Sequence, residues 1–374
     1  MAYSNVGTPV FYIDNYLYHK TIGTNLSNIA ETGDDTYDQY AVKPSSYPNL
    51  YNLSPSIAKN ITIPDGYHEY KMAIWTPMPS SVLDYDFSGN MKWYWAILNH
   101  DIPSFIVGFA SDDSSESAIT VNSDSTEVLN GGFLGDNFYP LNGSSIITYS
   151  ENLPLQHSRL FISNIDSSIL LESIGAVSTG IQYTMPHSPD LNLTMEVEFD
   201  GVKTITTSGG GSISNVKYSG NPLWVNGDNK TNPFDVYEDT LDVTTTGARR
   251  NGRKSWSLKF SFIADTDLFS SNPRASSYTE HPNDSTYNNS DLTPLDSQGN
   301  PTSESYLSYN IDTDDSFYAQ VWNKTLGGTL PFIFQPDSSN KNEFFMCKFD
   351  QESLKISQSA YRVYDFSVKI TEVW

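Results

Sequence analysis

The chain has 374 residues, with 44 acidic against 21 basic side chains and a net charge of −23 at neutral pH. This charge argues against nucleic acid as a main partner, because phosphate binding requires an extended basic surface. The single cysteine, Cys347, excludes an internal disulfide framework and a cysteine-built metal site. Its place in the apolar run FFMCKF predicts a small buried filler.

Short apolar runs, many alternating with polar residues, recur from one end of the chain to the other between Ser, Thr, Asn, Asp and Gly. They predict an all-β fold. A boundary is predicted near residue 180, because cations are sparse before it and the Pro-rich turn TMPHSPD follows it. The expected units are two β-sandwich or jelly-roll-like domains, an N-terminal one over 1–180 and a C-terminal one over 181–374. Residues 21–66 and 270–305 are two long, mostly polar segments. We expect them to become ordered against a neighbour.

The opening residues contain neither an early charge nor an uninterrupted apolar stretch, so no secretory signal is expected. No apolar run approaches the roughly 20 residues of a membrane span. Synthesis in the cytoplasm without membrane insertion is therefore expected.

The segment WYWAILNHDIPSFIVGFASDD predicts two strands whose inward faces include Trp95. Asn99, His100 and Asp101 are predicted to lie in the turn between the strands. One interpretation makes His100 and Asp101 a ligand-binding or catalytic pair. The favoured interpretation is a polar β-turn in which Asn99 and Asp101 bond to local backbone, because turns select these residue types.

Two segments resemble the discoidin-like, or galactose-binding-like, jelly rolls of phage tail proteins: WAILNHDIPS…IVGFASDD and HSRLFISNIDSSILLESIGAVSTG. The resemblance covers residues 90–180 and implies a jelly-roll fold for this half. It also makes Asn99, His100 and Asp101 candidates for glycan binding. Sugar binding needs a planar polar cluster beside an exposed aromatic ring, and the sequence does not locate one.

The segment SGGGS at 208–212 predicts a hairpin tip. Farther along, SWSLKFSFI and YDFSVKITEVW alternate apolar and polar residues and predict two strands with one face in a core. The short helix predicted over 313–327, in TDDSFYAQVWNKTLGG, begins at Thr313 or Asp314 and ends at two glycines. The predicted core comprises Trp95, Trp256, Leu258, Phe260, Phe262, Trp322, Phe332, Phe334 and Phe366.

A cluster of cations stands out in this acidic chain at GARRNGRKSW. We expect Arg249, Arg250 and Arg253 to bridge to acidic loops of adjacent copies, with Lys254 as a further interface candidate. The alternative is a solvated basic turn, since an exposed ion pair contributes only about 0–1 kcal/mol.

Four segments occur in a fixed order over 181–374, and together they resemble virion tail and baseplate proteins of tailed phages, particularly marine ones. They begin TMPHSPDLNLTMEVEFDG, GARRNGRKSWSLKFSF, DDSFYAQVWNKTLGGTLPFIFQPD and FMCKFDQESLKISQSAYRVYDFSVKI. The resemblance implies a structural protein of the tail tip or baseplate that forms or joins a multimeric ring. Its expected location is the virion, and its expected partners are copies of itself and other virion proteins.

Two alternatives remain: a receptor-binding or fibre protein that recognises host surface glycan, and a glycan depolymerase. Acid pairs such as Asp112 and Asp113 could form a glycosidase dyad, but they arise freely in a chain this rich in Asp. Histidine spacings typical of metal sites, a nucleophile elbow and a P-loop are missing from the sequence. The sequence therefore predicts a protein that is not an enzyme and has no cofactor and no metal.

Overall fold

The computed structural model describes residues 6–13, 53, 59–62, 69–74, 91–100, 105–110, 119–122, 128–129, 131–134, 137–140, 144–149, 157–163, 171–198, 203–215, 253–269 and 316–373. Strands predominate in these residues, and the strand pairs are antiparallel, which confirms the all-β prediction. The helical elements of the described part are α2 (Asp265–Leu268) and a π-helical turn, η9 (Tyr318–Asn323).

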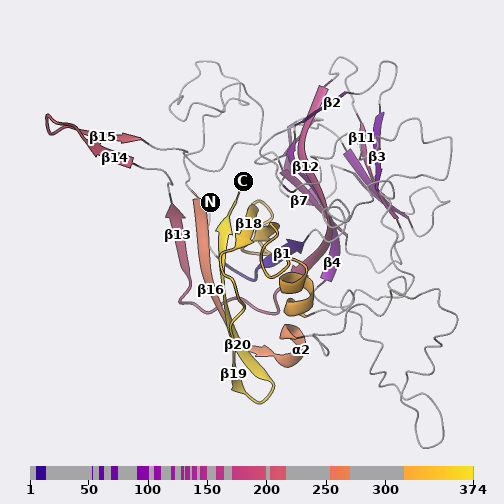
Figure 1. Ribbon diagram of the computed structural model, residues 1–374. Helices are drawn as coiled ribbons and strands as arrows, with labels where there is room; N and C mark the ends of the chain where they lie inside the picture. The colour runs from indigo at the N-terminus through magenta and orange to yellow at the C-terminus, as the bar shows by residue number, and fades with distance from the viewer. Residues whose placement is uncertain are drawn as a thin grey trace, which may run out of the picture.

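One sheet of twelve strands forms the body of the protein (Figure 1). Its strands lie in the order β13-β16-β20-β18-β17-β1-β12-β4-β10-β7, with β19 paired to β20 and β2 paired to β12. They are β1 (Val10–Ile13), β2 (Lys59–Thr62), β4 (Met91–His100), β7 (Val128–Leu129), β10 (Ser144–Tyr149), β12 (Leu171–Thr184), β13 (Thr194–Glu198), β16 (Arg253–Ala264), β17 (Phe332–Gln335), β18 (Phe345–Phe349), β19 (Ile356–Ala360) and β20 (Val363–Glu372).

Three smaller sheets accompany it. The first, in the order β3-β11-β5-β6, contains β3 (Glu69–Ile74), β5 (Phe105–Ala110), β6 (Ile119–Asn122) and β11 (His157–Ser163). The other two are hairpins, β8 (Gly131–Leu134) with β9 (Asn137–Pro140), and β14 (Lys203–Thr206) with β15 (Ser212–Asn215). The β14–β15 hairpin confirms the turn predicted at SGGGS, and Gly210 has a positive φ of 82° there.

The N-terminal strand β1 joins the two halves of the large sheet. It pairs with β12 on one side, through Phe11 opposite Tyr183, and with β17 on the other, through Phe11 opposite Phe334. The boundary predicted near residue 180 falls inside β12 (Leu171–Thr184). Strands from both predicted domains thus share one continuous sheet, and the division into two units stays a prediction.

The central strands bury side chains on both faces of the sheet. On one face, Tyr12 of β1 contacts Tyr94 edge-on, with ring centroids 5.2 Å apart. Its hydroxyl donates a hydrogen bond of 2.7 Å to Gln335 Oε1. On the other face, Phe11 packs against Phe334 with centroids 5.4 Å apart. Phe11 belongs to an aromatic core, named here the main core, that also includes Trp256, Leu258, Phe260, Phe317, Trp322, Phe332, Phe349, Phe366, Val368 and Ile370.

Strands β16 and β20 show the predicted alternation over most of their length. Trp256, Leu258 and Phe260 are buried, whereas Ser257 and Lys259 between them are exposed. Trp95, Trp322, Phe332, Phe334 and Phe366 are buried as predicted. Cys347 is also buried and free, as expected of a filler.

Phe262 is the exception, because its side chain is 78% exposed and the prediction that it lies in the core is wrong. The pairing shifts between Phe260, which is opposite Phe366, and Ile263, which is opposite Tyr364. Strand β16 therefore has one residue more than β20 over this interval, which defines a β-bulge. The extra residue moves the inward position from Phe262 to Ile263, which is 1% exposed.

The predicted helix over 313–327 is described from residue 316 onward and forms a π-helical turn at Tyr318–Asn323. The proposed caps Thr313 and Asp314 lie outside the described residues. Ser316 Oγ accepts a hydrogen bond of 3.3 Å from the Ala319 N–H. The helical element ends at Asn323, before the two glycines that were predicted to end it. Gly327 and Gly328 follow in the succeeding turn and have positive φ.

Gly328 packs against Phe349, and this contact leaves no room for a side chain at position 328. Its φ is 90°, and a Cβ atom there would lie 2.8 Å from Phe349 Cβ. We expect Gly328→Ala to lower the free energy of unfolding by about 2 kcal/mol or more, because backbone strain and overpacking add. Urea denaturation measures this change. Gly209→Ala is the control, since nothing lies within 4 Å of its Cβ position, and an equal effect of both variants would contradict the packing described.

Candidate functional site

The bulge in β16 presents an aromatic ring to solvent in a strained backbone conformation. Phe262 has a φ of 64°, in the left-handed region that costs a bulky side chain energy. Its N–H donates a hydrogen bond of 3.0 Å to Asp365 Oδ1 on β20. This bond secures the bulge, so the neighbouring strand fixes the place from which the ring projects.

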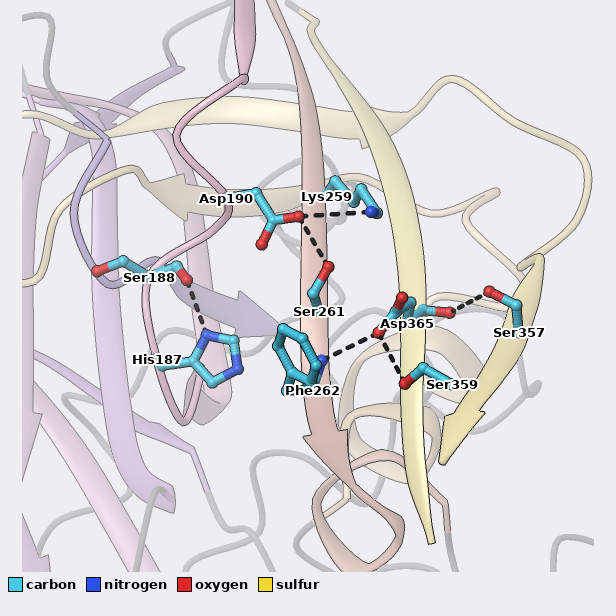
Figure 2. Close-up of polar contacts among 9 residues, drawn as sticks. All are labelled: His187, Ser188, Asp190, Lys259, Ser261, Phe262, Ser357, Ser359 and Asp365. Carbon is cyan, nitrogen blue, oxygen red and sulfur yellow. Dashed lines mark hydrogen bonds and ion pairs between the residues drawn. The ribbon is translucent and has the colours of Figure 1, made fainter. Parts of the chain in front are cut away.

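Asp190 links the segment after β12 to the same part of β16 (Figure 2). Ser261 Oγ donates a hydrogen bond of 2.8 Å to Asp190 Oδ2, and Lys259 Nζ lies 3.6 Å from the same oxygen. The Asp190 N–H donates to the Lys259 carbonyl at 2.8 Å. Ser261 is only 8% exposed, and the bond to Asp190 satisfies its hydroxyl.

Asp365 holds the other side of the bulge. Besides the Phe262 N–H, its Oδ1 accepts a hydrogen bond of 3.2 Å from Ser359 Oγ on β19. Ser357 Oγ donates to the Asp365 carbonyl at 3.4 Å (Figure 2). We call Asp190, Lys259, Ser261, Phe262 and Asp365 the bulge surface. No sequence pattern signals this surface, because a bulge without glycine leaves the apolar–polar alternation of SWSLKFSFI intact.

The β14–β15 hairpin is a second exposed feature and projects away from the large sheet (Figure 1). Ile205 and Ile213 are opposite each other across the two strands and are 54% and 60% exposed. The preceding strand β13 is the last in the order of the large sheet, and its Val197 is 46% exposed. Among the described residues, the outer edges of the hairpin and of β13 pair with no further strand, and both elements carry exposed β-branched side chains.

Of the predicted interface cations, the structure describes Arg253 and Lys254. Arg249 and Arg250 lie outside the described residues, and Arg253 is half-buried at the start of β16. Lys254 Nζ lies 3.4 Å from Glu343 Oε1 and 4.5 Å from the centre of the Phe345 ring. Lys254, a further interface candidate, thus has partners within its own chain.

Glu372 at the end of β20 lies beneath these cations. It is 2% exposed, and its Oε2 accepts a hydrogen bond of 3.0 Å from the Lys254 N–H. Burial raises the pKa of Glu372 to about 7, although Lys254 and Arg253 act in the opposite direction. Burial and the nearby Glu372 raise the pKa of the Cys347 thiol, so this cysteine is unreactive at neutral pH.

The predicted glycan candidates of the N-terminal half lie elsewhere than expected. Asn99 and His100 are the last two residues of strand β4, so the prediction that they lie in a turn is wrong. They are 4% and 1% exposed. Residue 100 pairs with Ile174 of β12, so the ladder continues through positions assigned to the turn. Asp101 lies outside the described residues.

His100 Nε2 lies 2.8 Å from Ser145 Oγ, a distance typical of a nucleophile and its general base. Burial lowers the pKa of His100 to about 3, so the imidazole is neutral at physiological pH. Ser145 is 0% exposed, and a substrate has no path to a hydroxyl at that depth. The pair therefore serves as a hydrogen bond inside the sheet.

Comparisons with known proteins leave the family open. No family model matches the chain, and no curated protein matches it. Among solved structures, the chain has a weak similarity to a DUF4466 family protein from Parabacteroides merdae. The identity is 9%, the coverage is 84% of this chain and 99% of the other, and the TM-score is 0.15. A score this low carries no argument about fold or function.

No group of three or more His, Cys, Asp or Glu side chains among the described residues is placed to hold a metal ion. No helix in the described part of the chain has the length and apolarity needed to cross a membrane.

Proposed function

We propose that this chain is a structural protein of a tailed-phage virion that forms or attaches to a multimeric ring in the tail tip or baseplate. The ordered resemblance of four segments over residues 181–374 supports the proposal, as does the all-β fold. The single structural observation that supports it most is the projecting β14–β15 hairpin with its exposed Ile205 and Ile213.

A two-stranded hairpin is at best marginally stable in water, because it has no core of its own. Every residue from Thr204 to Ile213 is exposed, so this hairpin gains no burial from its own chain. Contact with a neighbouring copy or another virion protein would cover its apolar face. The edge of β13 offers a complementary surface, since an unpaired strand edge readily accepts another strand.

The oligomeric state of a variant that carries both Ile205→Ser and Ile213→Ser tests this proposal. We expect the variant to shift the protein from a ring or higher oligomer to monomer at the same concentration, because the apolar contact area is lost. Sedimentation velocity and negative-stain electron microscopy measure the change. The control is Thr206→Ala with Ser212→Ala, which alters another exposed pair of the same hairpin.

A wild-type protein that stays monomeric at high concentration and with its virion neighbours would contradict the proposal. An unchanged ring in the isoleucine variant would remove the hairpin from the interface. The predicted bridges from Arg249, Arg250 and Arg253 to acidic loops of adjacent copies remain part of the proposal.

A further inference from the structure

We propose that the bulge surface binds a neutral carbohydrate, with the Phe262 ring stacked on the C–H face of one sugar and the carboxylates of Asp190 and Asp365 accepting hydrogen bonds from its hydroxyls. This site lies in the C-terminal half, away from the residues that the sequence suggested for glycan binding. The inference is independent of the assembly proposed above.

The aromatic ring is the first requirement of such a site. Phe262 is 78% exposed and keeps a φ of 64°, which most non-glycine residues avoid. A strained residue of this kind costs about 1–3 kcal/mol and persists only where surrounding contacts maintain it. The Asp365 hydrogen bond supplies that contact, so the fold holds an apolar ring in water at an energetic cost.

The second requirement is a set of polar groups that are fixed before the ligand arrives. Asp365 Oδ1 is engaged by the Phe262 N–H and Ser359, and Asp190 Oδ2 by Ser261 and Lys259. Within the described part of the chain, the second oxygen of each carboxylate accepts no hydrogen bond. Each carboxylate is therefore oriented by one oxygen and offers the other, which lowers the entropy lost on binding.

The chemistry of this surface fits a sugar better than a protein partner. A stable protein interface buries roughly 1,200–2,000 Å² around an apolar centre. The bulge surface instead offers a single exposed ring with two carboxylates and an ammonium group from neighbouring residues. A pyranose matches that layout, because it has an apolar C–H face and a rim of hydroxyls. The net charge of −23 disfavours acidic polysaccharides, so the expected ligand is neutral.

Saturation-transfer NMR on the full chain tests the proposal, with the methyl glycosides of glucose, galactose, mannose and N-acetylglucosamine as probes. We expect saturation of the C–H protons on one face of at least one sugar, with a Kd on the order of 1 mM. Phe262→Gly should weaken that binding at least about tenfold, because the stacking contact is lost. Glycine adopts the bulge φ without strain, so this variant should fold at least as well as wild type.

Two further variants make the test specific. Phe262→Tyr keeps an aromatic ring and should preserve binding. Tyr361→Ala removes a different exposed aromatic, 84% exposed at the β19–β20 turn, and should leave binding unchanged. Absence of saturation transfer to all four sugars would overturn the proposal, as would equal transfer in Phe262→Gly and wild type. Loss of self-association in Phe262→Gly without any sugar binding would assign the ring to a protein contact and overturn it as well.

Discussion

Replacing Trp256 by alanine is expected to lower the free energy of unfolding by about 3–5 kcal/mol, the cost of deleting a large aromatic side chain from a packed core. Trp256 is 1% exposed, and its ring lies 4.9 Å from Phe345 and 5.3 Å from Phe334, centroid to centroid. The indole therefore joins β16 to β17 and β18, and its loss leaves a cavity between three strands.

The control variant is a substitution of Phe262, six residues after Trp256 in the same strand. Phe262→Ala removes a ring of similar type, but this ring is 78% exposed, so a change within about 0.5 kcal/mol is expected. Urea denaturation of both variants, followed by tryptophan fluorescence and circular dichroism, gives the comparison. A large loss for Phe262→Ala would mean that this residue continues the alternation and that β16 has no bulge.

Glu372→Gln is expected to stabilise the protein at neutral and alkaline pH and to change its pH dependence. Burial raises the folded-state pKa of Glu372 to about 7 from an ordinary value of 4.5. Between these values the folded protein holds a proton that the unfolded chain has released, so stability falls as pH rises through this window. At about 1.4 kcal/mol per pKa unit, the full cost of the ionised carboxylate above about pH 7 is about 3 kcal/mol.

The glutamine keeps an oxygen that can accept the Lys254 N–H and carries no charge at any pH. We therefore expect the variant to match wild type near pH 5, and to exceed its free energy of unfolding by up to about 3 kcal/mol near pH 8. Urea denaturation at both pH values tests this difference. Glu352→Gln is the matched control, because Glu352 is exposed. Equal differences at both pH values would show that Glu372 ionises as an ordinary surface carboxylate.

The pattern of apolar residues was sufficient to predict the fold class and much of the core. In β16 and β20, side chains alternate because successive Cβ atoms of a strand point to opposite faces, and Trp256, Leu258, Phe260 and Phe366 are buried accordingly. The glycines at 327 and 328 lie in the turn that follows the helical element, where they adopt positive φ without strain. Local rules of this kind act within a few residues and are visible in a single sequence.

The candidate site could not be predicted in the same way. Phe262 continues the apolar alternation, and only its pairing with β20 shows that one residue of β16 is extra. Asp190 reaches Ser261 across 71 positions of the chain, and Asp365 reaches the Phe262 N–H across 103. No periodicity or spacing in the sequence signals contacts of this range.

The sequence by itself determined that this is an all-β protein and that Trp256, Phe260 and Phe366 are buried, because these features depend on neighbours a few positions away. The tertiary structure alone decided that β1 joins strands of both halves into one sheet, that His100 is buried beside Ser145, and that Phe262 is exposed. The reason is that strand pairing and register are set by contacts between distant segments, and a shift of one residue reverses which side chains face the core.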